Sequence, residues 1–129
     1  MKRINISSGA VWEDIVGYSR AVRVGNIIKV AGTTAVDGDE IQFPNQPFEQ
    51  TLFILEKIEA ALKQAGASME DVVCTRIYVC NIHAHWEDIG RAHGQFFGKI
   101  KPAATMVQVS ALIDPSLVVE IEAEAIIQP

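Results

Sequence analysis

Residues 117–127, with the sequence LVVEIEAEAII, alternate apolar side chains with glutamates over most of their length. Successive side chains of a β-strand point to opposite faces, so this pattern predicts a strand with one buried face and one acidic face. The buried face is expected to carry Leu117, Val119, Ile121, Ala123 and Ala125, and the acidic face Glu120, Glu122 and Glu124. Such a strand belongs in a sheet that other elements cover on one side only.

Two segments have the spacing of amphipathic helices, which suits them to cover such a sheet. The first is expected to end at Gly66, because glycine readily adopts the left-handed conformation that follows a helix. Its apolar stripe contains Phe48, Leu52, Leu55 and Leu62. The second is expected to begin after Asn81 and to end near Gly98. Its stripe contains Trp86, Ile89, His93 and Phe96.

Three more segments predict strands. Residues 19–36 contain two β-runs around Gly25 and Asn26, a pair typical of a tight turn, so we expect a hairpin there. Residues 72–80 alternate as residues 117–127 do. Pro102 ends the second helix, and a strand over residues 103–109 follows it. Its predicted core face carries Ala103, Thr105, Val107 and Val109, and its other face Ala104, Met106 and Gln108.

The predicted order of elements is strand–strand–helix–strand–helix–strand–strand. The chain of 129 residues is long enough for one domain, residues 1–129, and too short for two. The order indicates an α+β fold with one mixed sheet and two helices on one face. Connections that pass through a helix favour parallel pairing of the strands that they join. The polar segment 37–47, DGDEIQFPNQP, is expected to be a loop that acts as a lid or interface element.

Charge and residue spacing exclude several classes of function. The net charge is −5 and no basic stretch is present, so we expect no nucleic-acid partner. No run of about 18 apolar residues predicts a membrane helix, and no signal peptide is recognisable, so we expect a cytoplasmic protein. His83, His85 and His93 lack the spacing of a metal site, and no dinucleotide-binding glycine motif follows a strand. We therefore expect neither a metal nor another cofactor.

The sheet face away from the helices is predicted to be partly apolar. Cys74 and Cys80 are about 20 Å apart on an extended strand, too far for a disulfide, so we expect free thiols. An open face of this composition is typical of an interface, which predicts a homo-oligomer with the sheets packed toward its centre. The side chains expected there beside charged ones are Cys74, Tyr78, Cys80 and Met106.

Five segments in order resemble the Rid family of reactive intermediate deaminases, also called YjgF or L-PSP proteins. They are GYSRAVRVGNIIKVAGT, QTLFILEKIEAALKQAGA, DVVCTRIYV, KPAATMVQVSAL and VVEIEAEAI, and they extend from about Tyr18 to Ile127. The resemblance implies a chorismate-mutase-like fold and homotrimers with clefts between subunits. It also implies hydrolysis of 2-imino or enamino acids, in which water attacks the imine carbon and ammonia leaves.

The resemblance carries the family's site over position by position. Tyr18 stands at the tyrosine of the pocket, and Glu120 at the glutamate that orients the attacking water. The family's serine before a glycine is replaced by Ala31, which precedes Gly32. The arginine that grips the substrate carboxylate is replaced by Ala104. The chain therefore resembles a branch of the family that lacks the carboxylate-binding arginine.

Further positions of the family's site also differ. Met106 stands where a cysteine is often found, and Gly90 and His93 replace an asparagine and a tyrosine of the second helix. If the face with Ala104 and Met106 adjoins the face with Glu120, the pocket keeps its carboxylate but loses its cation. Three arginines could supply this cation: Arg20, Arg76 and Arg91. Arg91, which follows Gly90, is counted among the substrate-binding candidates.

Two functions remain open. The first is a hydrolytic deaminase of small reactive imine or enamine metabolites with an altered substrate class, in which Glu120 places the water. The second is a non-catalytic trimer that binds a small metabolite in clefts walled by Ala31, Ala104 and Met106. An RNA-directed activity, also attached to this family, is disfavoured by the acidic charge.

Overall fold

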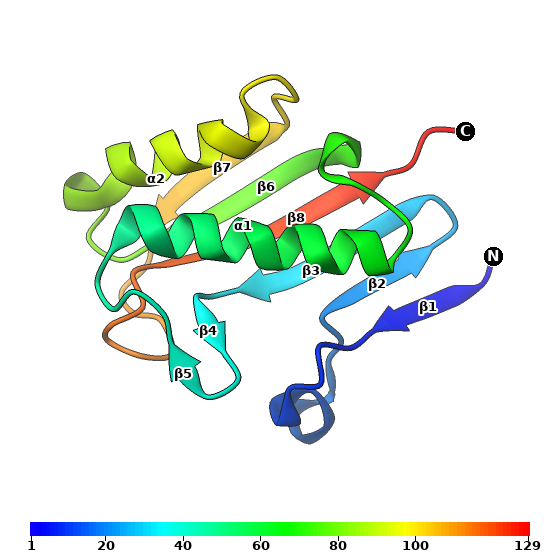
Figure 1. The fold of residues 1–129 in the computed structure, drawn as a ribbon, viewed down its shortest axis with the longest axis horizontal. Coiled ribbons are helices and arrows are strands. Elements are labelled where there is room, and N and C mark those ends of the chain that lie inside the picture. The colour runs from blue at the N-terminus through cyan, green and yellow to red at the C-terminus, as the bar shows by residue number, and fades with distance from the viewer.

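A six-stranded mixed sheet with two long helices on one face makes up the computed structural model, which describes residues 1–129 (Figure 1). The strands of this sheet are β1 (Arg3–Ile6), β2 (Ala21–Val24), β3 (Ile27–Thr33), β6 (Val72–Val79), β7 (Ala103–Gln108) and β8 (Val119–Ile126). The long helices are α1 (Pro47–Gln64) and α2 (Ile82–Phe97), and the short turns are η1 (Glu13–Gly17) and η2 (Met69–Asp71). The predicted α+β fold with both helices on one face is confirmed.

The strand order across the sheet is β1-β2-β3-β8-β6-β7. β6 and β7 are parallel, as predicted for strands joined through α2. The strands joined through α1 are not neighbours, because β8 lies between β3 and β6 and pairs antiparallel with both. The parallel pairing expected across α1 was therefore wrong. β1 and η1 were not predicted at all.

The predicted turns and helix ends are largely confirmed. Gly25 lies at φ +60° in the turn between β2 and β3. Gly66 follows α1 at φ +85°, a conformation that glycine adopts without steric cost. Asn81 precedes α2 in the left-handed conformation. The polar segment expected to be a loop includes β5 (Glu40–Ile41), which forms a small hairpin with β4 (Val36–Asp37).

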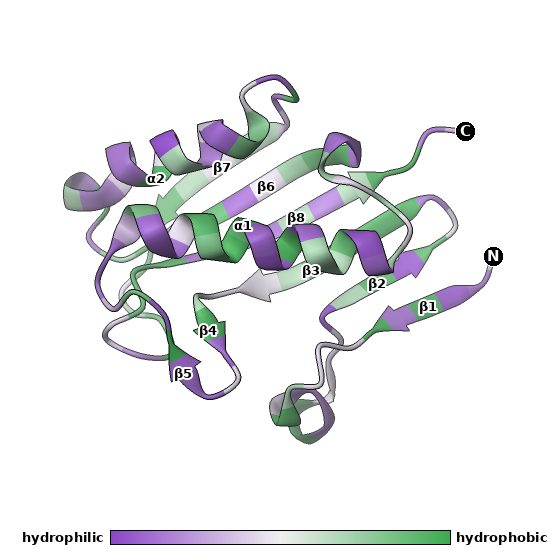
Figure 2. Cartoon of the chain, in the orientation of Figure 1, coloured by the Kyte–Doolittle hydropathy of each residue, from purple (hydrophilic) through white to green (hydrophobic).

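The core lies between the sheet and the two helices, where 23 buried residues form one hydrophobic cluster. Figure 2 shows hydrophobic and hydrophilic residues alternating along β6 and β8, as expected for strands with one covered face. The predicted buried face of β8 is confirmed, since Val119, Ile121 and Ala123 are at most 2% exposed. The three glutamates of β8 are only partly buried and lie on the open face.

The predicted core face of β7 was wrong. Met106 packs against the hydrophobic core, whereas Val107 is 43% exposed. Ala104 and Met106 pair in register with Thr75 and Ile77, both of which are buried beneath the helices. Ala104 and Met106 therefore lie on the helix-covered side of the sheet and not on its open face. The pairing with β6 sets these faces, and the alternation within β7 itself is too weak to show it.

Gln50 of α1 is fully buried and joins two other backbone segments to this helix. Its Nε2 donates hydrogen bonds to the carbonyl oxygens of Phe43, at 3.0 Å, and Ser116, at 2.9 Å. Its Oε1 accepts a hydrogen bond from the backbone N–H of Val118 at 3.0 Å. This one side chain thus fixes the loop before α1 and the segment that leads into β8.

Candidate functional site

The site is built around Gly32, where a bulge interrupts the pairing of β3 with β8 between Val30 and Thr33. The carboxylate of Glu120 lies directly over Gly32, and a Cβ atom added at Gly32 would overlap the Oε2 atom of Glu120. A glycine is therefore required at this position on steric grounds, because it lets the carboxylate of Glu120 lie against the backbone. The bulge and the glycine together set the position of Glu120.

Arg20, the residue before β2, approaches the same glycine. Its Nη2 atom donates a hydrogen bond to the carbonyl oxygen of Gly32 at 2.7 Å. Its guanidinium carbon lies 5.9 Å from the ring centroid of Tyr18, close enough for a cation–π interaction. The Nε–H of Arg20 is buried and has no hydrogen-bond partner. Arg20 and Glu120 thus both contact Gly32.

Glu120 is the partly buried carboxylate of this group. Burial raises the pKa of Glu120 above its ordinary value, the nearby Arg20 charge partly offsets this, and Glu122 adds to the rise. The four salt bridges of the chain join other pairs, so no ion pair within 4.0 Å ties Glu120 to Arg20. A carboxylate with a raised pKa that is free of an ion pair is suited to exchange protons with a bound molecule.

The structure brings some of the predicted site residues together and separates others. Tyr18, Ala31, Gly32 and Glu120 are gathered at the bulge with Arg20. The remaining candidates lie on the helix-covered side of the sheet: Ala104, Met106 and Arg91. Within one chain, Ala104 and Met106 therefore lie on the opposite side of the sheet from Glu120.

The two other candidate arginines have partners elsewhere. Arg91 of α2 lies 2.9 Å from the Asp88 carboxylate and 4.2 Å from the ring centroid of Phe48. Arg76 of β6 forms salt bridges with Glu122 at 3.7 Å and Glu124 at 3.0 Å. Of the three arginines considered, only Arg20 lies beside Glu120.

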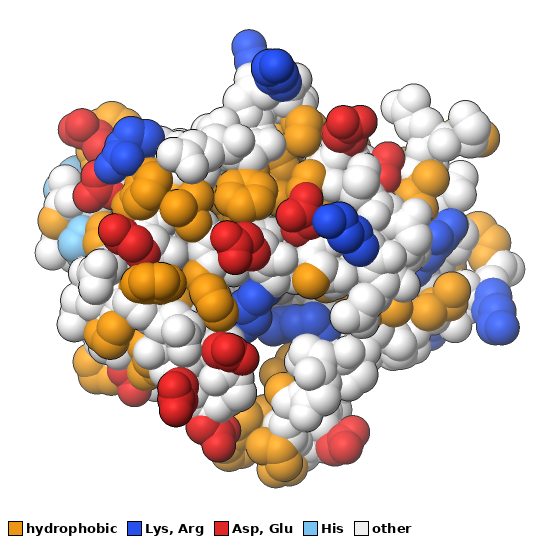
Figure 3. Space-filling view, in the orientation of Figure 1, with side chains coloured by type: hydrophobic (Ala, Val, Ile, Leu, Met, Phe, Trp, Pro, Cys, Tyr) orange, Lys and Arg blue, Asp and Glu red, His pale blue; other side chains and the backbone are white.

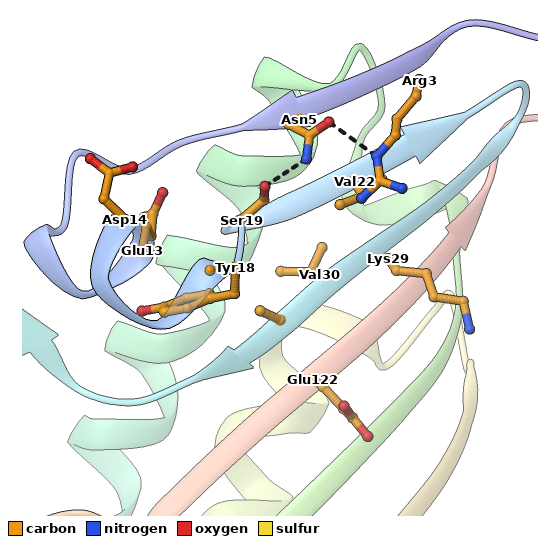
Figure 4. A pocket seen from close by; sticks show the side chains of 12 residues that line it. Arg3, Asn5, Glu13, Asp14, Tyr18, Ser19, Val22, Lys29, Val30 and Glu122 are labelled. Carbon is orange, nitrogen blue, oxygen red and sulfur yellow. Dashed lines mark hydrogen bonds between the residues drawn. The ribbon is translucent and has the colours of Figure 1, made fainter.

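A pocket of about 590 Å³ adjoins the site on the open face of the sheet (Figure 4). Tyr18 and Ala31 line it together with side chains that were not predicted, because β1 and η1 were not predicted. Asn5 of β1 donates a hydrogen bond to the Ser19 hydroxyl at 2.8 Å and accepts one from Arg3 at 3.2 Å. The charged lining residues have mixed signs: Arg3, Glu13, Asp14, Lys29 and Glu122.

His93 contributes a polar contact on the other side of the sheet. Its Nε2 atom lies 3.0 Å from the hydroxyl oxygen of Thr75, the β6 residue that pairs with Ala104. Burial lowers the pKa of His93, which favours its neutral form.

No group of three or more His, Cys, Asp or Glu side chains is arranged to hold a metal ion. None of the helices combines the length and apolar character needed to cross a membrane.

Comparison with known proteins places the chain in a family. The model of the family described as Endoribonuclease L-PSP matches residues 10–127. The chain belongs to the Rid/YjgF family. Among the solved structures similar to this Rid protein is Rv2704 of Mycobacterium tuberculosis, described as a member of the YjgF/YER057c/UK114 family. The two are 49% identical with a TM-score of 0.89, over 98% of this chain and 100% of Rv2704.

More distant relatives of this Rid protein agree. SCO2049 of Streptomyces coelicolor is 37% identical over 121 residues, which cover 93% of this chain and 89% of SCO2049. The RutC family protein PYRAB12510 of Pyrococcus abyssi is 36% identical over 109 residues, 84% of each chain. The resemblance noted in the sequence is thereby confirmed at the level of the family.

Proposed function

We propose that this Rid protein hydrolyses small imine or enamine metabolites, with Glu120 as the residue that places and activates water. The single observation that carries the proposal is the position of Glu120, which is partly buried against Gly32 and not tied into an ion pair. Burial raises the pKa of this carboxyl, and a general base works best when its pKa approaches the working pH.

In the proposed reaction, Glu120 carries the protons of the water molecule to the nitrogen of the substrate. Water forms a bond from its oxygen to the imine carbon while Glu120 accepts a proton from that water. The protonated Glu120 gives this proton to the nitrogen, and the carboxylate then takes the proton of the new hydroxyl group and passes it to the same nitrogen. The carbon–nitrogen bond breaks, ammonia leaves and the carbonyl compound forms. Glu120 ends in its starting state, so no other reactant is consumed.

The direct test is ammonia release from 2-iminobutanoate generated freshly in the assay. The wild-type protein should accelerate ammonia release above the uncatalysed rate. A rate equal to the uncatalysed one would contradict hydrolysis of this substrate. If a metabolite nevertheless raised the melting temperature in proportion to its concentration, the result would favour the non-catalytic binding function instead.

The pH dependence of the rate should report the Glu120 carboxyl. Only the ionised carboxylate accepts a proton from water, so activity should fall as the pH is lowered through the Glu120 pKa. Because burial raises this pKa, the fall should be centred above the ordinary value of 4.5. The measurement is kcat/KM between pH 4 and 8. A rate that stays constant across this range would contradict Glu120 as the base.

We also propose that the open face of the sheet is the contact surface of a homotrimer. No helix covers this face, and a row of partly exposed apolar residues crosses it: Val24, Ile27 and Ile126 are neighbours in register. Exposed apolar rows on an uncovered face are typical of interfaces. Light scattering at micromolar concentration should give three times the 14.1 kDa mass of the chain, and a monomer would contradict this proposal.

Two observations weigh on the alternatives. The non-catalytic binding function loses part of its support, because Ala104 and Met106 lie on the other side of the sheet from Ala31. The pocket that Ala31 lines still offers a place for a small polar molecule. An RNA-directed activity is disfavoured by the net charge of −5 and by the glutamates of the open face.

A further inference from the structure

We propose that Arg20 binds the substrate carboxylate, and that it thereby replaces the arginine missing at Ala104. This inference rests on the proposed function and adds to it the residue that holds the carboxylate end of the substrate. The cation would come from the residue before β2, on the same chain and beside the same glycine as the Glu120 carboxylate.

The first argument is position. Arg20 and Glu120 both contact Gly32, one through its carbonyl oxygen and the other where a Cβ atom would be. They are close enough for the Arg20 charge to act on the Glu120 carboxyl, yet no salt bridge within 4.0 Å joins them. A cation and a carboxylate that converge on one glycine without pairing would hold the anionic end and the reactive centre of one bound molecule side by side.

The second argument is an unused donor. The Nε–H of Arg20 is the only buried side-chain nitrogen or oxygen without a hydrogen-bond partner. Buried polar groups normally have partners, so an unpaired one at a candidate site points to a ligand. The guanidinium presents its donors in a planar fork that matches a carboxylate. Only Nη2 is occupied, by the Gly32 carbonyl oxygen, so the rest of the guanidinium fork has no partner within the chain.

The third argument is the surrounding charge. Lys57 of α1 lies near enough to Arg20 for the two cations to influence each other. Burial and the Arg20 charge together lower the pKa of Lys57 to about 8, against the opposing effect of Asp37, so Lys57 is mostly charged at pH 7. Its Nζ atom donates hydrogen bonds to the carbonyl oxygens of Thr34, at 2.9 Å, and Val36, at 2.7 Å. Figure 3 shows basic side chains within a hollow on the helix-bearing face.

The acidic side chains near Arg20 either have hydrogen-bond partners within the chain or take part in the proposed reaction. Glu13 is buried in η1 and accepts hydrogen bonds from the backbone N–H and hydroxyl of Ser8. Glu120 is the proposed base. Arg23 of β2 donates to the carbonyl oxygens of Gly25 and Ala65, so it does not supply the cation.

The test separates binding from turnover by using the unreactive product 2-oxobutanoate, titrated calorimetrically. Wild-type protein should bind 2-oxobutanoate more tightly than its neutral amide, 2-oxobutanamide. Arg20→Gln should weaken 2-oxobutanoate binding by about 10- to 100-fold, the range expected for a lost charge-assisted hydrogen bond. The affinity of Arg20→Lys for 2-oxobutanoate should lie between those of the wild type and Arg20→Gln, because lysine keeps the charge but lacks the planar fork of donors. Arg76→Gln is the matched control and should bind as the wild type does.

Two results would overturn the role of Arg20. One is equal binding of 2-oxobutanoate by Arg20→Gln and the wild type. The other is wild-type protein that does not prefer the carboxylate over the amide, a comparison that requires no variant to fold. Glu120→Gln should retain 2-oxobutanoate binding. If that variant also kept full hydrolytic activity while Arg20→Gln lost binding, the proposed base would be wrong and the carboxylate site would stand.

Discussion

Replacement of Glu120 by glutamine should lower the rate of ammonia release from 2-iminobutanoate by about 10²- to 10⁴-fold, the usual contribution of a positioned general base. Glutamine has nearly the same size and can still rest over Gly32, but its amide cannot accept the proton of the attacking water. The loss should therefore appear in kcat, measured by coupled detection of ammonia. The acid-side fall of the pH profile should disappear with it.

Glu124→Gln is the matched control for this variant. Glu124 lies on the same face of β8, but its carboxylate is held by Lys29 at 2.7 Å and by Arg76 at 3.0 Å. The control removes one negative charge from the same strand without touching the bulge, and it should keep kcat within about threefold of the wild type. Equal rates for wild type and Glu120→Gln would end the proposed role of Glu120.

Replacement of Gln50 by leucine should lower the free energy of unfolding by about 3–5 kcal/mol. Leucine fills a similar volume but leaves the carbonyl oxygens of Phe43 and Ser116 and the N–H of Val118 without the partners they now have. Each buried polar group left unpaired costs about 1–3 kcal/mol. Urea unfolding followed by circular dichroism measures the effect.

Gln64→Leu serves as the comparison for Gln50→Leu. Gln64 is the last residue of α1 and is exposed, so the same substitution there should change the free energy of unfolding by no more than about 0.5 kcal/mol. If both variants unfolded at the wild-type urea concentration, the hydrogen bonds of Gln50 would contribute nothing net to stability. Gln50 would then not hold the loop before α1 and the segment that leads into β8 together.

The sequence was most informative where the two faces of an element differ sharply in polarity. In β8 glutamates oppose Val119, Ile121 and Ala123, so the alternation leaves no doubt about which face is buried. In β7 the contrast between faces is small, because Ala104 and Met106 are as apolar as Val107. At the edge of the sheet, register with β6 decides the faces, and register is not readable from the strand itself. β1 was missed because RINI is only four residues long.

Only part of the candidate site could likewise be predicted from the sequence. Tyr18, Ala31, Gly32 and Glu120 were found through the family resemblance, and the structure gathers them. Arg20 was one of three arginines that could supply the cation, and Arg91 was the one counted among the substrate-binding residues. Only its contact with Gly32 and its unpaired Nε–H distinguish it, and both depend on the bulge in β3. Side-chain distances across a bulge have no signature in residue spacing.

The placement of β8 has a consequence for how the chain is made. β8 is the last of the six strands of this sheet to be synthesised, yet it lies inside the sheet and pairs with β3 on one side and β6 on the other. Until it emerges, those two strands have no common neighbour, and their apolar faces remain exposed to other nascent chains. The sheet can therefore close only after synthesis has passed residue 126, in a step dominated by contacts distant in sequence. Glu120 arrives on that same strand, so the proposed base reaches its place over Gly32 in the closing step of folding.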